Sequence, residues 1–211
     1  MPFSIDVPGA MKATEIPMPD ALSAAALAGG LSWASGLRLY MTLFIAGWFG
    51  RAGWIELPPA LQVLQSPWVL GLTGALLIVE FLADKIPGID SAWDAIQTFI
   101  RVPAGAILGA AALGQMWPEW TAAAALLGGT FAAGAHATKA GSRALINTSP
   151  EPFSNWATSF SEDVVVLGGL WAAFFHPWLL FGLLAVFFLL AIWLLPKLWR
   201  GLRWFVRRLH A

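Results

Sequence analysis

Long apolar segments alternate with short polar ones along most of this chain. Each apolar segment ends at a charged or proline-containing stretch, and the last run, residues 164–195, is too long for one crossing of a hydrocarbon core of roughly 30 Å. We divide that run at His176 and Pro177. The pattern predicts six transmembrane helices, at about residues 21–50, 68–83, 102–116, 120–137, 160–175 and 178–196.

The remaining segments are polar or amphipathic. Residues 1–20 contain four prolines and predict a flexible tail, followed by a transmembrane domain over residues 21–196. Residues 87–101 predict a short amphipathic helix between two spans. Residues 197–211 predict a basic amphipathic tail that lies on the membrane surface and binds anionic lipid headgroups.

Composition agrees with a membrane protein. Of 211 residues, 58% are hydrophobic and 11% are charged, whereas soluble domains carry about 25% charged residues. The formal net charge is zero and there is no cysteine, so we expect no nucleic-acid partner and no disulfide. We predict an all-α protein embedded in the lipid bilayer. Six spans and the basic tail then place both termini in the cytoplasm.

Two helical hairpins of this chain resemble each other. Residues 83–85 align with residues 137–139, and residues 94–101 align with residues 155–162. The pattern predicts a parallel internal repeat, although apolar helices also resemble one another by chance. Transporters often bind substrate where two such repeats meet. Gly105, Gly109 and the Gly128–Gly129 pair predict close helix packing.

Charged residues inside apolar surroundings are the candidate functional residues. Arg38 lies within the first predicted span, where a guanidinium is costly unless it faces the bundle interior, and Glu80 is a candidate partner. A polar stretch, residues 134–163, separates two uncharged apolar segments. The candidate substrate-binding residues are Arg38, Glu80, Asp84, Lys85, Arg101, His136, Lys139, Arg143, Asn155, Glu162 and Asp163.

Each part of this set has two interpretations. Glu80 and Asp84, spaced i, i+4, share a helix face and indicate either a proton or cation site or salt bridges to the basic residues of the set. The basic residues at 136, 139 and 143 also share a face. They indicate either an anion or phosphate-headgroup site or pairing with Glu162 and Asp163.

The sequence contains no familiar catalytic motif. It has no phosphate-binding glycine loop, no HExxH and no nucleophile elbow. We therefore predict no catalytic residue, no metal and no cofactor.

Several motifs together carry a family resemblance. They are GLRLY at 36–40, ExxxDKIPGID at 80–90, IRVPAG at 100–105, HxxKxxxR at 136–143 and NTSPEPFSNxxxSxxED at 147–163. Over about residues 30–175 the chain resembles an uncharacterised bacterial integral-membrane family that is catalogued as a domain of unknown function. The resemblance implies a small polytopic inner-membrane protein and supplies no activity. IRVPAG alone also resembles a segment of lipid-carrier flippases.

We predict a small transporter, flippase-like or channel-like, that moves a small or lipid-linked anionic substrate through the polar cluster at the repeat interface. A chain this small is expected to form a homo-oligomer. Two alternatives stay open. One is a membrane assembly or scaffold protein whose buried charges are structural. The other is a membrane enzyme that acts on lipid headgroups with carboxylates as acid and base.

Overall fold

The computed structural model describes residues 18–86, 88–113, 118–147 and 152–209, and most of the tail predicted for residues 1–20 lies outside them. Every regular element in these ranges is a helix, which confirms the all-α fold class. The elements are α1 (Met18–Leu37), α2 (Leu39–Arg51), η1 (Pro59–Gln65), α3 (Pro67–Ala83), α4 (Ile89–Ala112), α5 (Pro118–Ile146), α6 (Pro152–Phe175) and α7 (Pro177–Leu209).

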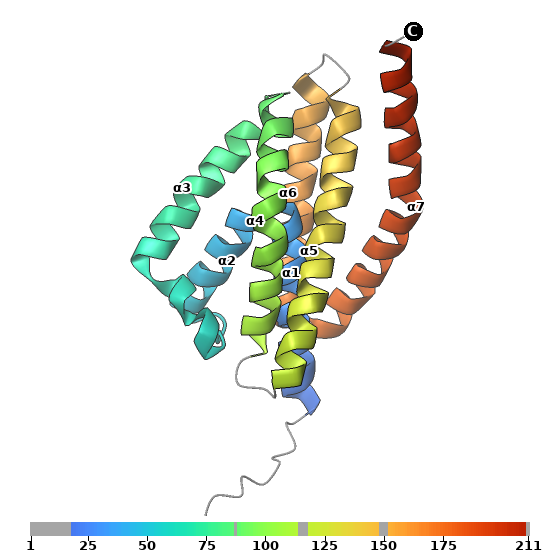
Figure 1. The fold of residues 1–211 in the computed structure, drawn as a ribbon. Helices are drawn as coiled ribbons and strands as arrows, with labels where there is room; N and C mark the ends of the chain where they lie inside the picture. The colour runs from blue at the N-terminus through green and yellow to red at the C-terminus, as the bar shows by residue number, and fades with distance from the viewer. Residues whose placement is uncertain (1–17, 87, 114–117, 148–151, 210–211) are drawn as a thin grey trace, which may run out of the picture.

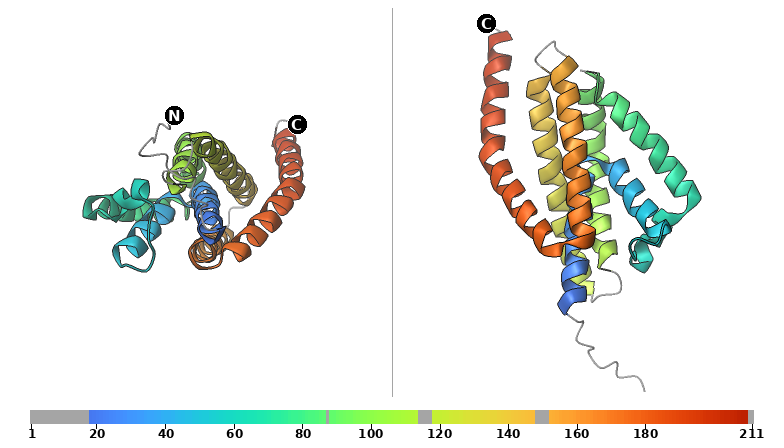
Figure 2. Two further views of the ribbon diagram at one scale, coloured as in Figure 1. Left: turned by 90° about the horizontal axis from the view of Figure 1, so that it is seen from below. Right: turned by 180° about the vertical axis from the view of Figure 1, so that it is seen from behind.

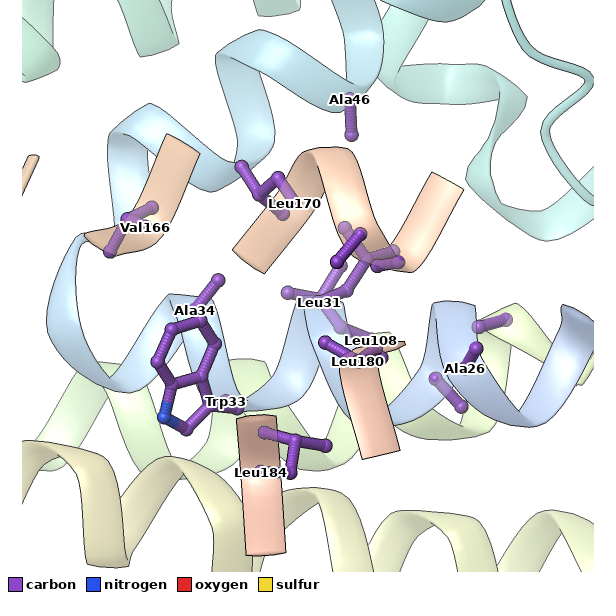
Figure 3. Packing of buried hydrophobic residues seen from close by; sticks show 14 of the residues in the cluster. Ala26, Leu31, Trp33, Ala34, Ala46, Leu108, Val166, Leu170, Leu180 and Leu184 are labelled. Atoms are coloured by element: carbon purple, nitrogen blue, oxygen red, sulfur yellow. The ribbon is translucent and has the colours of Figure 1, made fainter. Parts of the chain in front are cut away.

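The helices form a bundle around α1. Helices α4, α5 and α6 run along it, while α2 and α3 lean away on one side and α7 stands on the other (Figures 1 and 2). Around α1 the core is apolar: Leu31 and Trp33 lie among Leu170 of α6 and Leu180 and Leu184 of α7 (Figure 3). Buried ion pairs connect the end of α3 with α5, and α5 with α6.

The first predicted span is wrong, because the chain breaks at Arg38. Arg38 has φ −142° and ψ 82°, which ends α1 and begins α2. Helix α2 then runs back toward the end of the bundle at which α1 begins (Figure 1). In a continuous helix, the position of residue 38 on the helix face would determine where the Arg38 guanidinium lies. The break instead places Arg38 among the carboxylates described below.

Residues 88–101 do not form a separate short helix. They are the first half of α4, which continues to Ala112 with Pro103 inside it. A proline removes one helical hydrogen bond, but helices packed against neighbours in membrane proteins tolerate it. The polar stretch 134–163 is helical on both sides of the turn, in α5 and α6.

The carboxyl-terminal segment also differs from the prediction. The break at His176 is confirmed, but residues 197–209 continue α7 instead of forming a separate surface element. Helix α1 begins at one end of the bundle and α7 ends at the other (Figure 1).

Two helices of the described chain are long and apolar enough to cross a membrane, or three if the bent pair η1 and α3 is one span. The two are α4 and the Pro177–Gly201 part of α7, and the bend between η1 and α3 is 69°. The six predicted spans are thus not confirmed. Helices α5 and α6 carry buried charges that lower their hydropathy, and α1 is short.

Small residues bring α1, α4 and α5 together, as the glycine pattern predicts. A Cβ on Gly128 of α5 would lie 2.5 Å from the Gly105 carbonyl oxygen of α4 and 2.7 Å from Ser32 Oγ of α1. Ser32 Oγ donates to that same carbonyl at 2.8 Å. These backbones approach closely only because glycine has no side chain.

Candidate functional site

Helix α4 presents polar residues to the interior and apolar residues to the outside. Asp90, Asp94 and Arg101 are buried on the face that packs against the bundle, whereas Phe99 is 82% exposed and Ile96 60%. A soluble amphipathic helix does the opposite. The charged face of α4 therefore joins the charges of α3, α5 and α6 inside the bundle.

Ten buried ionisable side chains form one network, which we call the charge cluster. Its least buried member, Asp163, exposes 13% of its side chain. The members are Arg38, Glu80, Asp84, Asp90, Asp94, Arg101, Lys139, Arg143, Glu162 and Asp163.

Arg38 connects the helix break to α6 and to the end of α3. Its guanidinium forms an ion pair with Asp84, and its Nε lies 2.9 Å from Asp163 Oδ1. Its Nη2 lies 3.3 Å from Glu162 Oε2 and donates to Ser159 Oγ at 2.9 Å. Glu80, the partner predicted for Arg38, pairs instead with Arg101, and Arg38 contacts these three carboxylates.

Asp84, just after α3, is shared by three basic side chains. Besides Arg38, Lys139 Nζ lies 3.3 Å and Arg143 Nη2 3.6 Å from Asp84 Oδ2. Burial acts to raise the pKa of the Asp84 carboxyl, but the charges of Lys139, Arg38 and Arg143 outweigh burial and hold that pKa below its usual range. Asp84 is therefore charged and fixes the end of α3 against α5.

Arg101 is the centre of a second set of contacts within the cluster. It pairs with Glu80 of α3, and its Nη1 lies 3.2 Å from Asp94 Oδ1. Its Nη1 also lies 3.1 Å from His136 Nδ1, while His136 Nε2 lies 2.7 Å from Thr98 Oγ1. A guanidinium only donates, so His136 Nδ1 accepts and the imidazole is neutral, with its proton directed at Thr98.

Arg143 joins α5 to the start of α6. Its Nε and Nη2 each donate to one oxygen of Glu162 at 3.0 Å, a bidentate pair. Its Nη1 lies 3.4 Å from Asn155 Oδ1 and 3.8 Å from Asp90 Oδ1. Asn147 Nδ2 donates to Asp90 Oδ2 at 2.8 Å. The turn between α5 and α6 is thus held by charged and amide groups.

Lys85 is a predicted site residue that stays outside the ion pairs of the described chain. Its Nζ donates to the Phe81 carbonyl oxygen at 3.2 Å and lies 3.0 Å from the centre of the Phe81 ring. Partial burial lowers the pKa of this ammonium group. Lys85 therefore covers an aromatic surface and does not neutralise a buried carboxylate.

The structure brings together ten of the eleven predicted site residues, with Lys85 as the exception, and adds residues that the prediction missed. The missed residues are Asp90, Asp94, Gln97, Asn147 and Ser159. A signal was present for three of them. Asp90, Asp94, Gln97 and Arg101 follow i, i+4, i+7 and i+11 spacing, which places them on one helix face.

A cavity borders the charge cluster. It has a volume of about 190 Å³, lies between α4 and α5, and is lined by Asp94, Thr98 and Arg143 together with Ser91 and small residues. A larger cavity of about 440 Å³ is lined almost wholly by apolar residues and contains no predicted site residue. The smaller cavity therefore borders the charge cluster between α4 and α5, and the larger one does not.

The charge cluster contains six carboxylates and four basic side chains, a formal surplus of two negative charges. Each basic side chain lies within 4.0 Å of at least two carboxylates. Within the described residues, no group of three or more His, Cys, Asp or Glu side chains has the arrangement of a metal site.

Residues 25–197 match the family described as "Domain of unknown function (DUF4126)". The chain belongs to the DUF4126 family. This confirms the resemblance to a family of unknown function, and the DUF4126 match spans the whole charge cluster. No curated protein and no solved structure matches the chain.

Proposed function

We propose that this DUF4126 protein is an integral-membrane transporter of the bacterial inner membrane, channel-like or flippase-like, with the charge cluster on the transport path. The observation that carries the proposal is the burial of ten ionisable side chains inside a bundle whose exterior is apolar. Ionisable groups inside a membrane protein are costly and most often line ion or substrate pathways.

The balance of charges in the cluster narrows the chemical class of the transported species. An anion needs basic groups that are free to receive it, and each basic side chain of the cluster already contacts carboxylates. The surplus of carboxylates favours a proton or another small cation as the transported or coupled species. The predicted anionic substrate remains possible only if it displaces these carboxylates.

The orientation follows from the exposed basic residues. Lys197, Arg200 and Arg203 lie on the last part of α7, at the end of the bundle that also holds the turns after α3 and α5 (Figure 1). The positive-inside rule places this end in the cytoplasm, where the same residues meet anionic headgroups.

An internal repeat and a homo-oligomer remain part of the proposal. The hairpins α3–α4 and α5–α6 turn at the same end of the bundle, as a parallel repeat requires (Figure 1). Asp84 of the first hairpin pairs with Lys139 and Arg143 of the second. This crossed pairing supports a functional contact between the two hairpins.

The mutual pairing of the charges also favours the second candidate, a scaffold whose cluster only holds the helices together. Buried pairs that satisfy one another specify a structure without any transport. The two candidates differ in whether water enters the cluster and whether ions cross the membrane.

Thiol labelling separates these candidates, because the chain has no cysteine. Ala140→Cys places a thiol on the wall of the smaller cavity, and Ala132→Cys places one in the fully buried contact of α5. Transport predicts that a membrane-impermeant reagent labels Ala140→Cys and spares Ala132→Cys. Proteoliposomes containing the protein should then show a cation or proton flux. Folded protein without labelling and without flux would support the scaffold.

A further inference from the structure

Asp90 differs from every other carboxylate of the charge cluster. Glu80, Asp84, Asp94, Glu162 and Asp163 each have a basic nitrogen within 3.2 Å. The basic nitrogen nearest to Asp90 in the described chain is Arg143 Nη1, at 3.8 Å from Oδ1. A fully buried carboxylate without a close cation is costly to keep charged.

The hydrogen bonds of Asp90 point the same way. Its Oδ2 accepts from the neutral amide of Asn147, and its Oδ1 has no hydrogen-bond donor among the described residues. Asp90 is 0% exposed. A proton on this carboxyl removes the buried charge. The neutral acid then loses less free energy than a carboxylate would from having no hydrogen-bond donor at Oδ1.

The groups around Asp90 define its electrostatic surroundings on every packed element. Asp94 lies one turn further along α4, α5 contributes Arg143, and Asn147 directly follows α5. The remaining charged groups that face this region are Asp84 after α3, Lys139 of α5 and Glu162 of α6. Arg143, the nearest cation, already holds both oxygens of Glu162 at 3.0 Å, so its charge is shared.

We propose that Asp90 is a proton-binding site that exchanges protons with water through the cavity between α4 and α5. The wall of that cavity contains Ser91, next to Asp90, and Arg143. Asn147 Nδ2 donates to Asp90 Oδ2 and also to Ser91 Oγ at 2.9 Å. The inference rests on the proposed function, since it names the ion that a transport path through this cluster takes.

Proton exchange at Asp90 is coupled to the rest of the cluster through Arg143. A hydronium ion in the cavity transfers a proton to an Asp90 carboxylate oxygen: one O–H bond of hydronium breaks, an O–H bond forms on Asp90, and a neutral acid and a water molecule result. Loss of that proton returns a full negative charge 3.8 Å from Arg143. Asp90 then competes with Glu162 for the same guanidinium, and Glu162 is also a partner of Arg38.

Infrared spectroscopy of the full chain in lipid nanodiscs tests the site without any flux. Protonated carboxyl groups have a carbonyl band separate from that of carboxylates, and ¹³C-labelled aspartate shifts the band of aspartic acids alone. We expect an aspartic-acid band at mildly acidic pH that declines as the pH is raised toward and above neutrality. A missing band, a band that the aspartate label does not shift, or a band that persists at high pH would each overturn the proposal.

A pair of substitutions on one face of α4 assigns the band. Asp90→Asn mimics the neutral acid, so it should remove the band and keep the thermal midpoint of the wild type. Asp94→Asn removes a paired carboxylate, so it should keep the band and lower the midpoint. A band that survives in folded Asp90→Asn overturns the assignment. If Asp90→Asn does not fold, this also opposes a neutral Asp90, because the amide replaces it with little change in charge or shape.

The spectra test the proton site at Asp90 and the flux assay tests the transporter, so either proposal can be overturned without the other. A band assigned to Asp90 with no proton or cation flux would keep the proton site and remove the transporter. A flux without the band would keep the transporter and remove Asp90 as its proton site.

Discussion

Helices α4 and α5 contact each other in two chemically different ways along their length. In the half toward the α3–α4 turn, Asp90, Asp94 and Arg101 face His136, Lys139 and Arg143. In the other half, glycine backbones touch, with a would-be Cβ of Gly105 only 2.3 Å from Ala132 Cβ. Apolar side chains gain little by meeting each other in lipid. The charged half therefore depends on ionic pairing and the glycine half on close packing.

The largest effect is expected in the charged half, from Asp84→Asn. This change leaves Arg38, Lys139 and Arg143 without a shared carboxylate. Breaking a buried ion pair by removing one partner costs about 3–5 kcal/mol. We expect a large fall in the thermal midpoint of the detergent-solubilised protein. Glu56→Gln, at an exposed position, is the control and should leave the midpoint unchanged. An unchanged midpoint in Asp84→Asn would show that pairing contributes nothing to stability.

A smaller loss is expected in the glycine half, from Gly128→Ala. The added methyl group would lie 2.5 Å from the Gly105 carbonyl oxygen, and overpacking of this kind costs about 1–3 kcal/mol. Thermal unfolding measures the change in stability, and Gly168→Ala on α6 is the control, for which the opposite sign is expected. Gly168 has no neighbouring atom within 4 Å of an added Cβ, so alanine there should stabilise the helix by up to about 1 kcal/mol. Equal effects at both positions would contradict the close contact.

Both kinds of contact between α4 and α5 could be predicted in part from the sequence. The glycine contacts follow from the spacing of small residues, and the pairing of Glu80 and Asp84 with Arg101, Lys139 and Arg143 follows from the cost of buried charge. These are local or energetic arguments, and they needed no knowledge of the path of the chain.

The break at Arg38 and the role of α4 were missed for a different reason. GLRLY contains no proline, and its glycine lies two residues before the break, so no local turn signal marks residue 38. The backbone conformation there is selected by partners on α3 and α6, far away in the sequence. The periodicity of residues 88–101 predicted a short amphipathic helix between two spans, and it did not show that the helix would continue to Ala112 with its polar face buried and its apolar face exposed.

Acid pH tests the charged half without changing the sequence. The pKa of Asp84 is lower in the folded protein than its unfolded value of about 4. The stability that Asp84 supplies is therefore fully present above about pH 4 and is lost as the pH falls through the lower, folded pKa. Thermal midpoints should fall in this acidic window for the wild type. Asp84→Asn should show a weaker fall, whereas Gly128→Ala should follow the wild-type profile, and an identical profile for all three would contradict the assignment to Asp84.

The smallest effect is expected at Lys85, which compares a lysine outside the charge cluster with Lys139 inside it. Lys85→Gln loses a contact with the Phe81 ring and a hydrogen bond to a carbonyl oxygen. A cation–π contact at a partly exposed site is worth about 0.5–1 kcal/mol, so the thermal midpoint should fall little. Lys139→Gln removes a cation that lies 3.3 Å from Asp84 and 3.5 Å from Asp94, and its loss should be several times larger. Equal falls in the thermal midpoint for Lys85→Gln and Lys139→Gln would show that burial among carboxylates does not set how much a lysine stabilises this bundle. The charge cluster would then not act as a single unit.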